Sequence, residues 1–489
     1  MYKKLFSETL VYGMGAILPR LIIFVLNPLY NIYLLNSEYS KFSQLYAAIS
    51  FLNVFLTFGF ETAFFRFAPE KNMYQKVLNT AFLFMLSTSS LFLIFLYTFL
   101  DPIAEVAGYQ NYEKYLVWFG WIAFFDTICV IPFAVLRFKG RPMIYSGIRI
   151  VQTLFQALVT FALFALIPAE FLESIHFTDK LSYPFLANLF VSILGVFLLL
   201  GVIKEIRFKF DFPLFKRMFK YGYPIMLAGF AFIINENFDK LIHRFFAIEA
   251  YSEDGVRLTE ALVTEADAGS YSACYKLAMI MTMFVTAYRM GVEPFFFKVS
   301  KNSDSKQTYA NILFVFSVIC NILVLGILAN LSWITKIFVP NKSFHSAMDI
   351  VPIILVANLF YGVYYNLSTW YKVTDKTYVG TVVSCIGGVI TILMNILLIP
   401  KYGFMVSAWA TLIAYGTMMV ISYFWGQRSY KIPYQTGKIV FYMAIAIALS
   451  YVNYYVLHSD LIIGNLLLIS YIALLFFAEK SSIKKLIRK

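Results

Sequence analysis

The sequence has few charged residues for its length. Only 14% of its 489 residues are Asp, Glu, Lys or Arg, whereas soluble globular proteins average about 25%. Together with 60% hydrophobic residues and a mean hydropathy of +0.73, this composition excludes a water-soluble enzyme. It indicates a polytopic membrane protein.

Cysteine is also scarce. The four cysteines fall inside apolar runs with no short-range pairing: Cys129, Cys274, Cys320 and Cys385. This spacing supports neither a zinc site nor a disulfide framework. The sequence also lacks a nucleophile triad, a phosphate-binding loop and a metal-spaced cluster, so we expect a protein that is not an enzyme and binds no cofactor.

Long apolar runs make up most of the chain. A transmembrane helix needs about 20 apolar residues, and the runs predict an all-α membrane protein with about 14 spanning helices. The N-terminus has no small-residue cleavage site, so the first run is expected to be retained as a helix. The predicted spans are 9–35, 42–66, 77–100, 115–136, 144–168, 185–203, 224–247, 269–297, 308–333, 350–371, 378–399, 404–425, 439–457 and 461–478.

Positive charge is distributed unevenly over the loops. In a chain this apolar, the net charge of +13 indicates membrane orientation rather than a nucleic-acid partner. With both termini in the cytoplasm, the cytoplasmic segments hold 27 Lys/Arg and 7 acidic residues, whereas the opposite loops hold 7 and 15. The positive-inside rule therefore predicts that 137–142 and 480–489 are cytoplasmic and that the acidic segment 248–267 is outside.

An internal repeat relates the two halves of the chain. FGFETAFFRFAPEKN (58–72) aligns with MGVEPFFFKVSKN (290–302) at an offset of 232 residues. The matched pairs are Gly59 and Gly291, Glu61 and Glu293, and Arg66 and Lys298. An even number of spans per copy makes the repeats parallel, related by an axis along the membrane normal. We therefore predict two parallel six-helix lobes around a central cavity, which is typical of an alternating-access transporter.

The repeat also predicts how the chain is divided. The predicted parts are an N-terminal lobe (1–203), a cytoplasmic amphipathic linker (204–223), a C-terminal lobe (224–425) and two further spans with a basic tail (426–489). Basic residues alternate with aromatic residues along the linker, which is typical of a helix lying on an anionic leaflet.

Ionisable residues inside the predicted spans are the candidate functional residues. They cost about 2.5–3.5 kcal/mol each on insertion scales, so they usually face a cavity or pair with one another. Span seven carries a polar stripe with a four-residue period, which predicts a face directed at the lumen. The stripe consists of Glu236, Asp239, Lys240, His243 and Arg244. A set of internal ion pairs that only stabilises the bundle is the alternative.

The repeated Gly-x-Glu segments predict a cytoplasmic gate. Glu61 and Glu293 each lie about five residues before a basic cytoplasmic end, so both carboxylates are expected roughly 8 Å inside the inner mouth. Each carboxylate is then able to hold a basic partner across the gap, with Arg66, Lys298 and Arg289 as candidates. The alternative is that each segment packs only within its own lobe.

Three segments carry a family resemblance. NILLIPKYGFMVSAWATLIAY (395–415) combines an Asn, a Pro-Lys-Tyr-Gly turn and small residues; Pro and Gly close a tight turn, and small residues let two helices pack closely. The other two are GFETAFFRF (59–67) and NFDKLIHRFF (237–246) with the following AGSYSACYKLA (268–278). Together they resemble the polysaccharide and oligosaccharide-lipid flippases, similar to O-antigen flippases, of the multidrug/oligosaccharidyl-lipid/polysaccharide (MOP) exporter superfamily.

The resemblance implies a flippase in the bacterial inner membrane that translocates polyprenyl-diphosphate-linked oligosaccharide for surface polysaccharide synthesis, such as that of the lipopolysaccharide O-antigen. Its partners would be this lipid-linked oligosaccharide, membrane lipids and other polysaccharide-assembly proteins. Guanidinium groups pair bidentately with phosphate. The candidates for the headgroup are therefore Arg20, Arg149, Arg289 and Lys276.

A coupling ion, H⁺ or Na⁺, is also implied. The span-seven stripe and Asp126 are its candidate site. Within this stripe, His243 is either a proton relay or a histidine whose hydrogen bonds are satisfied inside the bundle.

Two other functions stay open on the sequence. A cation-coupled multidrug antiporter of the same superfamily would have fewer basic cytoplasmic loops and a carboxylate-dominated cavity. A membrane-embedded polysaccharide polymerase or acyltransferase would need a large outer catalytic loop or a His-centred intramembrane site. The longest predicted outer loop is the acidic segment 248–267.

Overall fold

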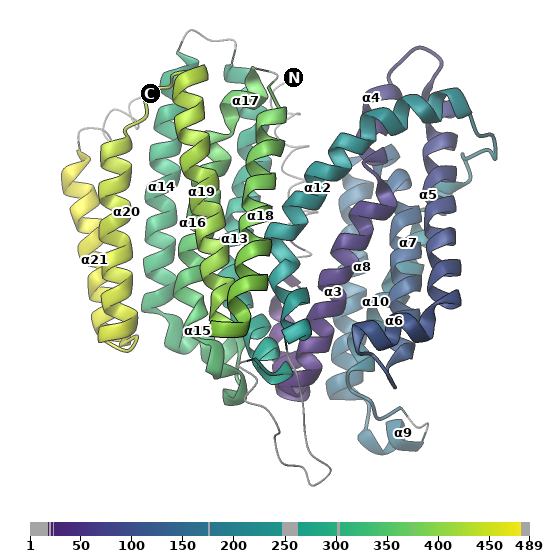
Figure 1. The fold of residues 1–489 in the computed structure, drawn as a ribbon, viewed down its shortest axis with the longest axis horizontal. Helices are drawn as coiled ribbons and strands as arrows, with labels where there is room; N and C mark the ends of the chain where they lie inside the picture. Colours follow the sequence, from purple (N-terminus) through teal and green to yellow (C-terminus); the bar gives the residue numbers. More distant parts are fainter. Residues whose placement is uncertain are drawn as a thin grey trace. The chain divides into compact units, whose positions relative to one another are not determined.

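The computed structural model describes residue 18 and residues 21–22, 24–174, 177–246, 263–300, 304–374 and 376–480. Within these ranges every regular element is a helix, and the chain divides into two compact units, Met1–Leu241 (unit 1) and Ile242–Lys489 (unit 2). Figure 1 shows the helices with their labels.

Unit 1 contains the helices from the N-terminus to α12, most of which it includes. They are α2 (Asn27–Tyr33), α3 (Asn36–Thr57), α4 (Phe60–Phe67), α5 (Tyr74–Thr98), α6 (Leu100–Ala107), α7 (Glu113–Phe138), α8 (Pro142–Phe161), η1 (Ala162–Leu166), α9 (Ala169–Ser174), α10 (Ser182–Leu198), α11 (Leu200–Ile203) and α12 (Phe212–Phe246).

Unit 2 begins in the last residues of α12. Its other helices are α13 (Glu265–Val299), α14 (Ser305–Ala329), α15 (Leu331–Phe338), η2 (Lys342–Ala347), α16 (Ile350–Leu367), α17 (Thr369–Val373), α18 (Tyr378–Tyr402), α19 (Met405–Ser429), α20 (Thr436–Tyr451), η3 (Val452–Val456) and α21 (Leu461–Ala478).

Ten helical segments in the described part of the chain are long and apolar enough to cross a membrane. A shorter apolar helix, Ser182–Leu198, corresponds to predicted span six. At about 1.5 Å per residue, the 35 residues of α12 and of α13 also exceed the bilayer thickness, but both helices carry the charges described below. Almost half of predicted span one lies outside the described residues, so the count of fourteen stays a prediction.

Local sequence explains where several helices begin and end. Thr264 and Asp267 form a capping box at the start of α13: the Asp267 N–H donates to Thr264 Oγ1 at 3.1 Å, and the Thr264 N–H donates to Asp267 Oδ2 at 2.9 Å. Gly403, with φ of 74°, ends α18 and allows the chain to return into α19. The predicted hairpin is thus present, with Pro400 inside the last turn of α18.

The predicted linker is held on unit 1. Residues 204–211 are not helical, and α12 then runs without interruption through Pro224. The Gln75 side chain donates to the Glu205 carbonyl at 2.8 Å, and Asn79 Oδ1 accepts from the Arg207 N–H at 2.9 Å. Leu214 and Met218 are buried in the same apolar cluster as α4, α5 and α7.

An ion pair also fastens the linker. Lys139 Nζ lies 2.6 Å from the Glu205 carboxylate. Burial alone would lower the pKa of the Lys139 ammonium, but the hydrogen bond to Glu205 and the electrostatic attraction of Glu205 and Tyr74 together raise this pKa above its ordinary value. The linker therefore belongs to unit 1, and the predicted four-part division of the chain stays a prediction.

The last two predicted spans pack against α14. Figure 1 shows α20 and α21 side by side. The buried Glu479 carboxylate joins them, accepting hydrogen bonds from Lys438 Nζ at 2.7 Å and from Tyr442 Oη at 2.9 Å. The Tyr471 hydroxyl donates to the Tyr442 carbonyl at 3.1 Å, so polar contacts fix the register of this appended pair.

Candidate functional site

Arg289 lies in a cluster of cationic and tyrosine side chains in unit 2. From α13 it donates to the Tyr361 hydroxyl of α16 at 3.0 Å, and its guanidinium lies 4.6 Å from the centroid of the Tyr365 ring. Lys372 of α17 lies 4.2 Å from the same ring centroid. Two cations thus lie close to the ring of Tyr365. We call these residues, together with Tyr364, Tyr371 and Tyr415, the cation–tyrosine cluster.

The other tyrosines extend this cluster. The Tyr364 and Tyr371 hydroxyls are 3.2 Å apart, and the Tyr361 and Tyr415 rings are 4.9 Å apart. Guanidinium and ammonium groups bind phosphate, and tyrosines offer both a hydroxyl and an aromatic face. The arrangement is chemically suited to a ligand that carries phosphate and polar rings.

Sequence reasoning singled out Arg289 but not the tyrosines around it. The signal is present in YGVYYNLSTWYK (361–372), where Tyr361, Tyr364 and Tyr365 recur at helical spacing on one face. In an aromatic-rich chain, such a pattern is also typical of ordinary packing. The contacts of Arg289 with Tyr361 and Tyr365 favour a binding site over ordinary packing.

The remaining headgroup candidates are dispersed. Lys276 is half-buried on α13. Arg149 of α8 belongs to unit 1, where its guanidinium lies 3.9 Å from the centroid of the Phe133 ring. Arg20 lies outside the described residues.

Asp126 of α7 forms a polar contact inside unit 1. Its Oδ1 accepts a hydrogen bond from the Ser192 hydroxyl of α10 at 2.8 Å, and Arg149 acts on the carboxylate electrostatically. Gln152 lies one turn from Arg149 on α8 and donates to the Val191 carbonyl at 3.3 Å. Three helices of unit 1 thus bring a carboxylate, a hydroxyl and a guanidinium together.

The span-seven stripe contains a buried ion pair. Lys240 Nζ lies 3.0 and 3.3 Å from the two Asp239 carboxylate oxygens and 2.9 Å from the Glu236 carbonyl. The exposed fractions of the Lys240 and Asp239 side chains are only 10% and 5%. Lys240 thus pairs with the carboxylate of its immediate neighbour. The Arg244 side chain lies outside the described part of the structure.

His243, at the end of the same helix, joins a polar chain in unit 2. Its Nε2 lies 2.7 Å from the Ser407 hydroxyl of α19, which donates to Asn395 Oδ1 of α18 at 2.5 Å. The His243 ring is fully buried and packs edge-on against Tyr271 at 4.7 Å. Asn395 and Ser407 come from the hairpin that carries the family resemblance, so the motif and the stripe meet here.

The gate residues are only partly described. Arg137 of α7 donates to the Glu61 carboxylate of α4, and both residues belong to unit 1. Arg66 lies 4.0 Å from Glu70, which Arg217 also approaches to 3.2 Å. The side chains of Glu293 and Lys298 lie outside what the structure describes. The gate requires contacts between the units and stays a prediction, whereas the Glu61–Arg137 pair lies within one lobe.

This pair is expected to contribute little free energy. In a double-mutant cycle of Glu61→Gln and Arg137→Gln, we expect a coupling of about 0–1 kcal/mol, because ion pairs accessible to solvent are weak and the two side chains are 43% and 35% exposed. Arg137→Gln alone should cost more, since the guanidinium also lies 4.9 Å from the Phe65 ring centroid. Chemical unfolding in detergent measures both quantities, and a coupling above about 2 kcal/mol would contradict this expectation.

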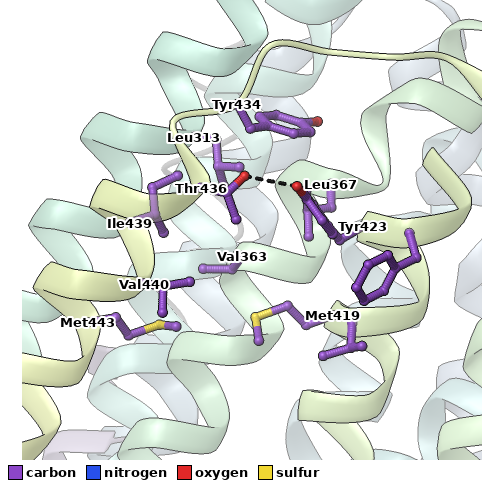
Figure 2. Close-up of a pocket in the computed structure, with 12 residues that line it drawn as sticks. Leu313, Val363, Leu367, Met419, Tyr423, Tyr434, Thr436, Ile439, Val440 and Met443 are labelled. Atoms are coloured by element: carbon purple, nitrogen blue, oxygen red, sulfur yellow. Dashed lines mark hydrogen bonds between the residues drawn. The ribbon is translucent and has the colours of Figure 1, made fainter. Parts of the chain in front are cut away.

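A separate apolar pocket lies within unit 2 and has a volume of about 130 Å³. Figure 2 shows its lining, which comes from α14, α16, α19 and α20 and from Tyr434 just before α20. The Thr436 hydroxyl donates to Tyr423 Oη at 3.1 Å at one end of the pocket. No charged side chain lines this pocket, so it suits an alkyl chain rather than a headgroup.

Metal binding has no support in the described ranges, where no group of three or more His, Cys, Asp or Glu side chains is placed to hold an ion.

Comparison with known protein families identifies the family of this chain. A model of the family described as polysaccharide biosynthesis protein matches residues 5–300, which is more than half of the chain. The chain belongs to this family. A comparison with curated protein sequences gave no match.

Solved structures with the same fold come from two groups. A lipid II flippase, MurJ, in an inward closed conformation aligns with a TM-score of 0.75 at 15% identity, covering 97% of this chain and 100% of that chain. An inward-facing multidrug resistance MATE family transporter of the MOP superfamily aligns with a TM-score of 0.66 at 11% identity, covering 84% and 94%. VcmN, a MATE transporter of Vibrio cholerae, aligns with a TM-score of 0.59 at 11% identity, covering 87% of this chain and 97% of that chain. The predicted all-α membrane fold is confirmed, and the family model confirms the resemblance to polysaccharide biosynthesis proteins.

Proposed function

We propose that this protein is a flippase that moves polyprenyl-diphosphate-linked oligosaccharide across the bacterial inner membrane by alternating access, for surface polysaccharide synthesis such as that of the O-antigen. The cation–tyrosine cluster carries the proposal. It places a guanidinium and an ammonium 4.6 and 4.2 Å from the centroid of one tyrosine ring, with further tyrosine hydroxyls nearby. A diphosphate needs the cations, and sugar rings need the aromatic faces and hydroxyls.

Family membership and the apolar pocket support the same substrate class. A polysaccharide biosynthesis protein that shares its fold with a lipid II flippase is expected to handle a lipid-linked saccharide. A polyprenyl chain also needs an apolar surface, which the pocket between α14, α16, α19 and α20 offers. Arg149 and Lys276 remain secondary candidates for the headgroup, and Arg20 remains a candidate from the sequence alone.

The competing function is a cation-coupled multidrug antiporter, which the fold shared with MATE transporters favours. The two functions differ in the charge of the substrate. Purified protein in proteoliposomes should translocate a fluorescent polyprenyl-diphosphate saccharide and leave ethidium on its original side. Ethidium exchange driven by a cation gradient, without movement of the saccharide lipid, would favour the antiporter and contradict our proposal.

Complementation tests the biological role. The gene is expected to restore surface polysaccharide to a strain that lacks its flippase and accumulates the lipid-linked sugar on the cytoplasmic side. A variant protein that is inserted but inactive, such as Arg289→Ala, is the matched control for expression. Continued accumulation with the wild-type gene, for every donor glycan tested, would contradict the proposal.

We also propose that transport is coupled to a proton through His243. Imidazole is the side chain that titrates near neutral pH, and here it is hydrogen-bonded to Ser407, which is bonded in turn to Asn395. The Asp239–Lys240 pair is a second candidate for coupling, together with Glu236 and Asp126. The alternative ion is Na⁺.

Replacing His243 should separate these possibilities. His243→Gln keeps an amide within reach of Ser407 but removes the titratable group, so transport should lose its dependence on a pH gradient while the protein stays folded. The matched variant Glu236→Gln should leave that dependence intact if His243 carries the proton. A response of the wild-type protein to a Na⁺ gradient alone, or an unchanged pH-gradient response of His243→Gln, would contradict proton coupling through His243.

A further inference from the structure

A polar cavity lies at the other end of α16 from the cation–tyrosine cluster. Its volume is about 520 Å³, and it opens between α15, η2 and the turn between η3 and α21, all within unit 2. The polar residues that matter here are Thr335, Lys336, Lys342, His345, Asp349 and His458. We call it the lysine–histidine pocket. Neither the family nor the proposed transport function assigns it a role.

The charge of this pocket favours an anion. Lys336 and Lys342 are exposed ammonium groups, and the His458 imidazole adds a donor from a different segment. The His345 Nε2–H is taken, because it donates to the Val339 carbonyl at 2.9 Å. Asp349 is the one carboxylate in the lining, and it accepts a hydrogen bond from the Tyr454 hydroxyl at 2.9 Å. A phosphate group matches this set of donors.

A buried hydroxyl points to a missing acceptor or donor. Thr335 is 6% exposed and lines the pocket, and its Oγ1 has no hydrogen-bond partner. A buried hydroxyl without a partner lowers stability, so native structures rarely leave one unsatisfied. Because Thr335 Oγ1 is itself buried, an oxygen of a bound ligand would satisfy it only after the side chain rotates toward the pocket.

The turn that carries His458 is conformationally strained. His458 and Ser459 both have left-handed backbone conformations, with φ of 49° and 55°. Hydrogen bonds hold this turn: the Ser459 N–H donates to the Asn453 carbonyl at 2.9 Å, and the Leu457 N–H donates to the Val452 carbonyl at 3.0 Å. Adjacent non-glycine residues in this region cost free energy, and such strain concentrates at binding sites.

The pocket lies where two membrane-crossing helices end. The candidate spans Ser305–Ala329 and Thr436–Val456 both finish just before residues that line it. Trp333 and Tyr455 beside it are 45% and 39% exposed. Exposed Trp and Tyr at span ends mark the membrane–water interface. A ligand at this depth has its charge at the headgroup level and its apolar part in the bilayer.

We propose that the lysine–histidine pocket binds the phosphate headgroup of an anionic phospholipid from the leaflet that meets this end of unit 2. The ammonium groups of Lys336 and Lys342 neutralise the phosphate, His458 donates to one of its oxygens, and Thr335 completes the set. The bound lipid ties the turn before α21 to α15 and thereby stabilises the appended helix pair α20–α21.

The test uses the full-length protein, delipidated in detergent and then supplied with phosphatidylglycerol or with phosphatidylcholine. Thermal unfolding and native mass spectrometry report on the binding. Phosphatidylglycerol should raise the unfolding temperature and be retained, whereas phosphatidylcholine should do neither. Lys336→Gln/Lys342→Gln should weaken phosphatidylglycerol binding by roughly tenfold or more. Lys401→Gln, at an exposed lysine in the last turn of α18, is the matched control and should bind as the wild type does.

Thr335→Val keeps the shape of the side chain and removes the hydroxyl. In phosphatidylcholine this variant should be as stable as the wild type or more stable, because a buried unsatisfied group is gone. In phosphatidylglycerol it should gain less stability than the wild type. Equal retention of phosphatidylglycerol by the double lysine variant and the control would overturn the proposal. Displacement of the lipid by millimolar glycerol phosphate would also overturn it, since the site would then select a soluble phosphate.

Discussion

Gly59→Ala is expected to destabilise unit 1 by about 2–5 kcal/mol, of which about 1–2 kcal/mol comes from the backbone and about 1–3 kcal/mol from overpacking. Gly59 has φ of +71° at the break between α3 and α4. A Cβ there would lie 2.7 Å from the Gly222 carbonyl oxygen of α12, a backbone atom that has no flexible end to move away. Thermal unfolding in detergent measures the loss, which should also appear as lower membrane abundance.

Gly222 and Gly147 provide the comparison for this variant. Gly222→Ala places a Cβ 2.6 Å from the Phe58 carbonyl oxygen without a left-handed backbone, so it should cost only the overpacking part. Gly147→Ala on α8 meets no atom within 4 Å and should be neutral or stabilising by up to about 1 kcal/mol. If Gly59→Ala unfolds at the same temperature as Gly147→Ala, the close contact between the α3–α4 break and α12 is wrong.

Arg289→Ala is expected to lower saccharide-lipid transport by roughly ten- to hundredfold, the range that corresponds to losing one charged hydrogen bond. Arg289→Lys should recover only part of the activity. One ammonium does not reproduce the planar guanidinium that donates to Tyr361 and stacks near Tyr365. Initial rates in proteoliposomes at limiting substrate measure the effect.

Arg428→Ala is the matched control for Arg289→Ala. Arg428 is exposed in the last turn of α19, so its loss should leave transport and abundance unchanged. Wild-type transport by a well-inserted Arg289→Ala protein would remove the cation–tyrosine cluster from the substrate pathway. A loss of transport with a matching loss of folded protein would assign Arg289 to packing alone.

The internal repeat illustrates how far the sequence predicts the structure. The alignment of Gly59 with Gly291 places both glycines at equivalent positions of two inward-running predicted spans. In unit 1 the chain breaks at Phe58 and Gly59, both left-handed, whereas α13 runs through Gly291 as one helix of 35 residues. The break in unit 1 brings Gly59 close to Gly222 of α12, a contact that no local pattern encodes.

Side-chain partners were predicted less well than spans. Periodicity along span seven predicts a polar stripe, and in the structure its Lys240 pairs within the helix, with Asp239. The partner of Glu61, however, is Arg137, which lies 76 residues away in the sequence and was not among its candidate partners. Likewise, His243 meets Ser407 at a separation of 164 residues. Helical spacing reaches only residues three or four apart, so it is blind to such pairs.

The sequence by itself determined the membrane class, the helical content, the hairpin at Gly403 and the family, because each depends on local hydropathy or on a contiguous motif. Only the tertiary structure decided which polar groups meet, as in the cation–tyrosine cluster and in the chain from His243 to Asn395. The physical reason is that apolar residues cover both faces of a membrane helix: Val379 is fully buried on α18, whereas Leu397 on the same helix is 60% exposed. Hydropathy therefore leaves the rotation of each helix undetermined, and packing with a few interhelical hydrogen bonds sets it.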